Sequence, residues 1–172
     1  MSHVRPGDHP EFFLRPPPPG RSRESTIVLD RHGRFFHDGE RVEHGGLNRG
    51  LARWVRRHPD NGRYILENGY DWCYFEVEAT PFFVTALEAT PSGPIMGEPL
   101  LVLSDGSREP LDPGSAAIDD DEVLRVRVKG GTEQARFTQA AQLQIAPFVA
   151  EDEPLALIVA GKRYEVSQPS GV

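Results

Sequence analysis

Three histidines in the first third of the chain are the side chains best suited to metal or proton chemistry. His32, His37 and His44 flank a short segment rich in turn residues. Imidazoles bind metals and act as general bases. Their spacing matches no common metal motif, and no cysteine lies near them. We therefore predict no metal site, and a small hydrolase that uses His37 or His44 is kept only as a second alternative.

Cys73 is the single cysteine of the chain and the one candidate for a thiol nucleophile. It stands in the apolar run Trp72–Phe75. Burial without a cationic partner raises the pKa of a thiol and leaves it unreactive. We interpret Cys73 as a buried structural residue in a protein of a reducing compartment.

Other catalytic signatures are absent from the sequence. It has no phosphate-cradling glycine loop, no serine elbow and no paired helical His-Glu set. The acidic run Asp119–Glu122 lacks the glycine and the closing glutamate of a calcium loop, so we interpret it as a solvated connection. No catalytic residue and no cofactor is predicted, and an enzyme is not the favoured class.

The charge of the chain is unevenly distributed. Residues 1–62 hold eleven arginines against eight acidic residues, whereas residues 63–172 hold eight basic against eighteen acidic residues. A nucleic-acid-binding protein concentrates positive charge on one face, and we expect no nucleic-acid partner. The chain has no apolar run of twenty residues and no signal-peptide core, so we expect a cytoplasmic protein without a membrane partner.

The chemistry-bearing residues must be positioned by an aromatic stretch, residues 63–89, that predicts three consecutive antiparallel strands. Asn68-Gly69 favours a two-residue hairpin between the first two strands. That turn sets the expected cross-strand pairs, which are Glu67 with Tyr70, Leu66 with Asp71, Ile65 with Trp72 and Tyr64 with Cys73.

Both faces of this predicted sheet are apolar. Cys73, Phe75 and Val77 line one face, and Trp72 and Tyr74 share the other with Ile65. A solvent-facing antiparallel sheet would alternate apolar and polar residues. We expect a helix of the same domain to cover one face, and a second domain, a partner chain or a ligand to cover the other.

Residues 47–58 supply that helix, because their apolar residues recur with a helical period. The apolar stripe is formed by Leu47, Leu51, Trp54 and Val55, and the opposite basic stripe by Arg49, Arg53, Arg56 and Arg57. Pro59 is expected to end the helix. The basic stripe is typical of a solvated face, and an anionic partner is the alternative.

Residues 1–24 are rich in proline and arginine and are interpreted as an arm. The run Pro16–Pro19 favours an extended polyproline conformation. The apolar trio Phe12-Phe13-Leu14 could dock on the body or on a partner, but a flexible leader is the favoured interpretation.

The sequence favours an α+β fold with two small domains. We predict a Pro-rich arm over residues 1–24, one α+β domain over 25–90, a linker over 91–99, a second α+β domain over 100–167 and a tail over 168–172. Each domain is expected to be a mainly antiparallel sheet with one packed helix.

Patterns within each half predict individual elements. In the first half they are strands near 26–29, 34–37 and 41–43, with a hairpin turn at Asp38-Gly39; in the second half they are strands near 100–103, 108–111, 123–129 and 133–137, a helix capped by Thr138, and a closing hairpin over 155–160 and 163–166. The two halves share an outline. A repeated unit and two unrelated α+β segments explain that outline equally well.

Several motifs together resemble a known family. The segments DRHGRFFHDGERV, GRYILEN and EATPFFV in the first half, and VKGGTEQARFTQAAQLQIAPFV and AGKRYEV in the second, are similar to the bacterial family catalogued as domain of unknown function 1285. The chain departs from that pattern at Phe35 or Phe36, at Thr80 and near Gly161. The resemblance implies two small packed α+β domains, no established enzymatic activity and a part in signal transduction through a small ligand.

We therefore expect a non-enzymatic small-ligand-binding or regulatory protein whose site lies between the two domains. The expected ligand-binding residues are Trp72, Tyr74, Arg125, Arg127 and Arg136. Clefts at domain interfaces with aromatic walls and a few polar groups are common binding sites. A protein–protein adaptor that binds a partner protein is the first alternative.

Overall fold

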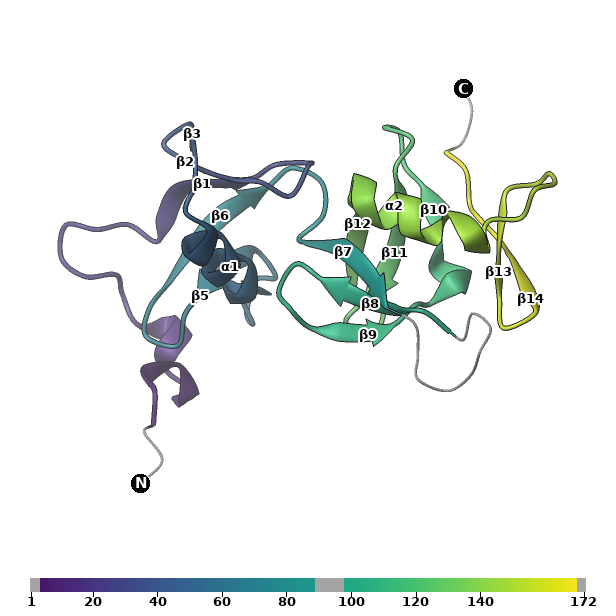
Figure 1. Cartoon of the computed structure of the whole chain (residues 1–172). Coiled ribbons are helices and arrows are strands. Elements are labelled where there is room, and N and C mark those ends of the chain that lie inside the picture. The colour runs from purple at the N-terminus through teal and green to yellow at the C-terminus, as the bar shows by residue number, and fades with distance from the viewer. Residues whose placement is uncertain (1–3, 89–97, 170–172) are drawn as a thin grey trace. The chain divides into compact units, whose positions relative to one another are not determined.

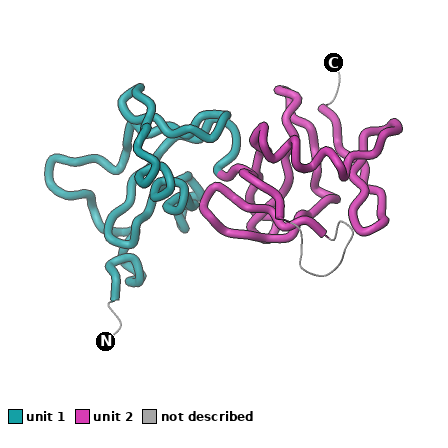
Figure 2. The backbone as a smooth tube through the Cα atoms, viewed as in Figure 1, with its two compact units in different colours: residues 1–81 teal, residues 82–172 magenta. Residues whose placement is uncertain are grey.

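A computed structural model describes residues 4–88 and 98–169 of the chain. It divides into two compact units, residues 1–81 and 82–172 (Figure 2). Each unit contains its own six-stranded sheet and one α-helix (Figure 1). The predicted α+β class with two mainly antiparallel sheets is confirmed.

Unit 1 is built around a parallel pair of strands at the centre of its sheet. The strand order is β3-β2-β1-β6-β5-β4, and only β1 and β6 are parallel. The elements are β1 (Glu24–Leu29), β2 (Phe35–His37), β3 (Glu40–Arg41), α1 (Gly45–Trp54), β4 (Val55–Arg57), β5 (Tyr64–Glu67) and β6 (Trp72–Val77), preceded by the 3-10 turns η1 (Pro6–Asp8) and η2 (Phe12–Leu14).

Unit 2 has a sheet of the same design and a separate hairpin. The strand order is β10-β11-β12-β7-β8-β9, with β7 and β12 parallel. The elements are β7 (Phe82–Glu88), β8 (Leu100–Leu103), β9 (Arg108–Pro110), η3 (Pro113–Ser115), β10 (Ala117–Ile118), β11 (Leu124–Val128), β12 (Glu133–Phe137), α2 (Gln139–Ile145), η4 (Ala146–Phe148), β13 (Ala156–Val159) and β14 (Lys162–Glu165). Thr138 caps α2 as predicted, because its side chain accepts a hydrogen bond from Ala141 N.

The two sheets repeat one topology. Read from the β9 edge, the order β9-β8-β7-β12-β11-β10 in unit 2 is the order of unit 1 with six added to each number. The repeated unit outlined by the sequence therefore exists, but its equivalences differ: β6 corresponds to β12 and not to the closing hairpin around Tyr164. The helices are not equivalent, since α1 precedes β4 whereas α2 follows β12.

The predicted hairpin at Asn68-Gly69 forms in a different register. The observed pairs are Ile65 with Tyr74, Leu66 with Cys73 and Glu67 with Trp72. The loop spans four residues because Asn68 Oδ1 accepts from the backbone N–H groups of Tyr70 and Asp71, and only Gly69 has a positive φ. The shift of two residues leaves every side chain on its expected face.

Helix α1 ends earlier than predicted. The chain enters β4 directly at Val55, which pairs with Leu66 of β5. Arg56 and Arg57 therefore belong to a strand, and the predicted basic stripe of the helix is reduced to Arg49 and Arg53. β-sheet pairing of buried Val55 overrides the helical period that ran through it.

The third predicted strand of the aromatic stretch does not join the first two. β7 pairs with β8 and β12 in the sheet of unit 2, so the expectation of three consecutive antiparallel strands is wrong for this strand. The division of the chain falls between Pro81 and Phe82. Most of the predicted linker, residues 91–99, lies outside the described residues.

Helix α1 covers one face of the unit 1 sheet, and the N-terminal segment, the part of the chain that contains η1 and η2, covers the other. A cleft of ≈ 200 Å³ between α1 and the sheet is lined by Leu51, Trp54, Leu66 and Cys73. On the other face, Phe12 of η2 is 3% exposed and packs with Ile65 and Trp72. The second cover is thus the chain's own N-terminal segment, in place of the expected second domain, partner chain or ligand.

No helix within residues 4–88 and 98–169 combines the length and apolar character that crossing a membrane requires.

Candidate ligand-binding site

Trp72 and Tyr74, two predicted ligand-binding residues, lie together on β6 beneath the N-terminal segment. Their rings meet edge to face with centroids 5.1 Å apart. Phe13 lies 6.0 Å from the Trp72 ring, and buried His58 lies 4.9 Å from it. The aromatic surface of unit 1, formed by Ile65, Trp72, Tyr74 and His58, is therefore covered by Phe12 and Phe13.

Arginines surround this aromatic surface. Three guanidinium carbons lie within 5.0 Å of an aromatic ring centroid there: Arg23 over Trp72, Arg56 over Phe13 and Arg63 over Tyr74. Arg57 lies over Tyr64 on the opposite face of the sheet. Cation–π attraction of this kind contributes roughly 0.5–1 kcal/mol at exposed sites. The sequence singled out Arg56 and Arg57, but as part of a helix, and it did not indicate Arg23 or Arg63.

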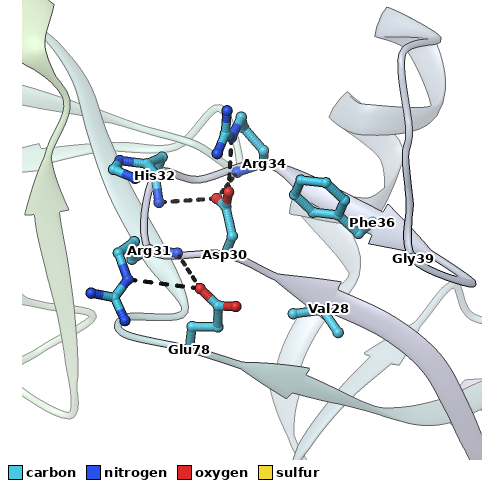
Figure 3. Close-up of a pocket in the computed structure, with 8 residues that line it drawn as sticks. All are labelled: Val28, Asp30, Arg31, His32, Arg34, Phe36, Gly39 and Glu78. Carbon is cyan, nitrogen blue, oxygen red and sulfur yellow. Dashed lines mark hydrogen bonds and ion pairs between the residues drawn. The ribbon is translucent and has the colours of Figure 1, made fainter.

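A second pocket of unit 1, with a volume of ≈ 430 Å³, lies at the turn between β1 and β2 (Figure 3). Asp30 stands at its floor and is 6% exposed. Its Oδ1 accepts from the backbone N–H groups of His32 and Arg34 at 2.9 and 2.8 Å, and its Oδ2 accepts from Arg34 Nε at 2.8 Å. Beside it, Glu78 Oε2 accepts from the backbone N–H of Arg31 at 3.1 Å.

The charges of this pocket neutralise one another. Burial raises the pKa of Asp30, but the hydrogen bonds from Arg34 and His32 outweigh it and hold the pKa below its usual range. Asp30 is thus an ionised carboxylate that orders the turn. Its oxygens are already engaged by the chain, so the pocket offers no free base or nucleophile on Asp30.

The pocket of unit 2 is larger and differently charged. It has a volume of ≈ 590 Å³, within the range of small-molecule sites. Its lining is polar and comes from η3 and its flanks, from β11 and β12, and from the end of the chain: Asp112, Gly114, Ser115, Ala117, Arg125, Val126, Arg127, Gln134 and Ser167. Two of the predicted residues, Arg125 and Arg127, therefore line one cavity.

Alternation along β11 places both arginines on one face. Leu124, Val126 and Val128 are buried in the core, so Arg125 and Arg127 point to the opposite side. Ser115 Oγ accepts from the backbone N–H of Arg127 at 2.9 Å and fixes η3 beside the strand. Within the described parts of the chain, neither guanidinium has a hydrogen-bond or ion-pair partner.

Arg136, the fifth predicted residue, is held elsewhere on the same face. It pairs with Arg125 across β11 and β12 and is 3% exposed. Its Nε lies 2.8 Å from Asp119 Oδ2, and its Nη2 lies 3.1 Å from Asp121 Oδ2. Two residues of the acidic run Asp119–Glu122 therefore bind the Arg136 guanidinium. This corrects the interpretation of the run as a solvated connection.

Backbone hydrogen bonds relate this pocket to unit 1. Glu78, after β6, donates to Leu29 O, and Thr138, after β12, donates to Val84 O, both at 3.0 Å. In each unit the donor thus points from the last strand toward its parallel neighbour. For L-residues, the side to which a residue's backbone N–H points determines the face of the sheet to which its side chain points. Glu78 and Thr138 therefore occupy equivalent positions in the two units.

It follows that the pocket lies on the repeat counterpart of the aromatic surface. Tyr74 and Gln134 each stand four residues before these donors and share one face. Their cross-strand partners are Ile65 and Arg127. The apolar residues that receive Phe12 in unit 1 are thus replaced by polar and basic residues in unit 2.

Solved structures show a chain of the same overall fold. A DUF1285 family protein from Silicibacter pomeroyi DSS-3 superimposes with a TM-score of 0.64 and 16% identity, covering 97% of this chain and 90% of that one. A DUF1285 family protein from Shewanella baltica OS155 gives a TM-score of 0.51 at 16% identity, covering 73% and 94%. The chain has the DUF1285 fold. No family model and no curated protein matches its sequence.

The DUF1285 fold separates the predicted site residues into two groups. Trp72 and Tyr74 lie in unit 1, and Arg125, Arg127 and Arg136 lie in unit 2. Sequence reasoning missed Ser115 and Gln134, which line the pocket with the arginines. The alternation of β11 with β12 could have indicated Gln134, whereas the position of η3 beside β11 leaves no signal in the sequence.

The histidines of this DUF1285 fold are not gathered into a site. His37 is exposed and lies 3.6 Å from Asp38, which is exposed as well. His44 Nδ1 caps α1 by accepting from Leu47 N at 3.1 Å. Among the described residues, no group of three or more His, Cys, Asp or Glu side chains is placed to hold a metal ion.

Proposed function

We propose that this chain is a small-ligand-binding protein with a regulatory role in bacterial signalling, and that its ligand is an anion held in the unit 2 pocket. The observation that carries the proposal is the pair of unpartnered guanidinium groups, Arg125 and Arg127, in a polar cavity of ≈ 590 Å³. Arginine binds carboxylates and phosphates through paired N–H groups.

Arg125 and Arg127 differ from the other arginines of unit 2 in having no ion-pair partner among the described residues. Other arginines of unit 2 are engaged: Arg108 binds Glu88, Arg136 binds Asp119 and Asp121, and Arg163 binds Asp152. Arg125 and Arg127 stand two residues apart on one strand, so their Cα atoms are about 6.6 Å apart. That spacing suits two anionic groups of one molecule, such as a dicarboxylate or a diphosphate.

Asp112 also lines the pocket and leaves it a net charge of +1. A carboxylate beside two arginines repels an anion but accepts a hydrogen bond from a hydroxyl or amino group. The ligand class is therefore an anionic metabolite that also carries a donor group.

The test is a thermal-shift screen of the full chain with inorganic phosphate, dicarboxylates, acidic amino acids, nucleotides and cyclic dinucleotides. A ligand at one hundred times its Kd adds about 2.7 kcal/mol, and each kcal/mol raises Tm by about 2–4 °C. We expect a saturable rise with one anionic class, and its Kd is then measured by calorimetry.

Three variants and one control decide whether the pocket is responsible. Arg125→Gln and Arg127→Gln are each expected to weaken binding at least about tenfold, the loss of a charged hydrogen bond. Asp112→Asn is expected to tighten binding of the same anion. Arg53→Gln removes an exposed arginine of unit 1 and is expected to change nothing. Equal affinity in all four variants, or no shift with any anion, would refute the proposal and favour the adaptor alternative.

A further inference from the structure

The N-terminal segment and the aromatic surface that it covers have the features of a bound peptide and its receptor. Phe12 is 3% exposed, and Phe13 packs edge to face against it and against His58 at 5.0 and 5.4 Å. Leu14, the next residue, is 72% exposed. Two adjacent aromatic side chains thus provide the apolar contact, in the manner of anchor residues.

Few other bonds hold the segment. Gly7 donates its backbone N–H to Gly69 O at 2.9 Å, and Arg23 Nη2 reaches the carbonyl oxygens of Arg15 and Pro16 at 3.2 and 3.3 Å. The following residues, Pro18 to Ser22, are exposed. The segment is therefore short and is joined to β1 by an exposed linker that contains proline.

The covered surface keeps an unused donor. Trp72 is 6% exposed, and its Nε1 has no hydrogen-bond partner among the described residues. A buried indole N–H without an acceptor is unfavourable, because its hydrogen bond to water is lost and not replaced. The segment therefore satisfies the apolar part of the surface but not its polar part.

Charged pairs border the surface. Arg23, Arg56 and Arg63 lie over the rings, and each also forms an ion pair with a carboxylate of unit 1, which is Asp71, Glu67 and Glu24 respectively. These pairs leave the apolar contacts of Phe12 and Phe13 as the main determinant of what binds. Two adjacent aromatic residues are thus the pattern that this surface accepts.

We propose that the aromatic surface of unit 1 is a peptide-binding surface that the N-terminal segment occupies in cis. Its occupant in trans is a segment of a partner protein with two adjacent aromatic residues. Such a segment displaces Phe12 and Phe13 and supplies an acceptor to Trp72 Nε1. This site is independent of the anion pocket in unit 2.

The test uses the full chain with Phe12→Ala and Phe13→Ala, which vacates the surface without shortening the protein. The probe is a synthetic peptide of residues 4–19, followed through the indole N–H signals of ¹⁵N-labelled tryptophan. We expect the peptide to shift the Trp72 signal saturably toward its wild-type position. A peptide with both phenylalanines replaced by alanine is expected to bind at least tenfold more weakly.

Trp54 on α1 reports whether unit 1 is folded in the double variant. If its signal is lost, the single variant Phe13→Ala replaces the double one, because Phe13 is only half-buried. If the variant is folded and its Trp72 signal does not change at millimolar peptide, the proposal is overturned. A Trp72 signal of the wild-type chain that changes on dilution also overturns it, since the occupant would then be the N-terminal segment of a second copy of this chain.

Discussion

Arg125 and Arg136 lie directly opposite each other on β11 and β12, yet carboxylates hold only Arg136. Like charges in such a pair repel. Asp119 and Asp121 neutralise the buried member, which leaves the charge of Arg125 available to the pocket. One arginine of the pair is thus structural, and the other has no hydrogen-bond or ion-pair partner among the described residues.

We expect Asp119→Asn to destabilise the chain by about 2 kcal/mol, because it removes one of two carboxylates from a buried guanidinium. Asn keeps the side-chain oxygen that accepts from the backbone N–H groups of Asp121 and Val123, so the change isolates the charge. Urea unfolding measures the difference. Asp120→Asn, an exposed neighbour, is the control, and equal stability of the two variants would contradict the ion-pair argument.

Asp30→Asn is expected to lose about 1–2 kcal/mol at pH 7, the cost of weakening hydrogen bonds to a charged group. Burial raises the pKa of Asp30, but the hydrogen bonds from Arg34 and His32 outweigh it and lower the pKa in the folded chain. Its charge therefore contributes stability above the unfolded pKa, and this contribution is lost as pH falls through the lower folded pKa.

Unfolding curves of wild type and Asp30→Asn from pH 7 to pH 2.5 check this. Their difference should stay constant above about pH 5 and shrink as pH falls through the unfolded pKa of about 3.9. A difference that persists unchanged at pH 2.5 would show that the charge of Asp30 contributes nothing.

Phe12→Ala should destabilise unit 1 by about 3 kcal/mol, since it empties a fully buried position. Leu14→Ala, two residues on, removes an exposed side chain and should stay within about 0.5 kcal/mol of wild type. Thermal unfolding of both variants is the measurement. Indistinguishable midpoints would mean that the N-terminal segment does not contribute to the core.

Cys73 should react slowly with thiol reagents. Burial raises the pKa of its thiol, and a hydrogen bond with Ser25 only partly offsets the rise. At pH 8 we expect labelling of the folded chain at least about tenfold slower than in urea. Ser25→Ala should slow it further, and fast labelling of folded wild type would disprove the structural role.

The sequence indicated most strands but not which strands would pair. At Asp38-Gly39 both residues have positive φ, at 51° and 79°, and the predicted two-residue turn forms. At Asn68-Gly69 the same type of dipeptide gives a four-residue loop, because Asn68 bonds to the backbone beyond it. At Asp38-Gly39 the dipeptide itself determined the turn. At Asn68-Gly69 the hydrogen bonds that the Asn68 side chain accepts from the backbone lengthened the loop.

The parallel pairing of β1 with β6 and of β7 with β12 could not be predicted, because it joins strands far apart in sequence. For the candidate site, the sequence named Arg125 and Arg127, and both line the unit 2 pocket. It could not show that Arg136 would be sequestered, since that depends on where the loop carrying Asp119 folds back.

The central pairing of the first strand with the last also governs the order of folding. The unit 1 sheet stays open until residue 77 has been synthesised, because β6 is the only bridge between the β1-β2-β3 and β4-β5 halves. Closing it brings together residues about fifty positions apart, which is slow compared with forming a local hairpin. During that interval on the ribosome the N-terminal segment has no aromatic surface to occupy. Docking of Phe12 and Phe13 therefore has to follow the pairing of β6, which supplies Trp72 to that surface.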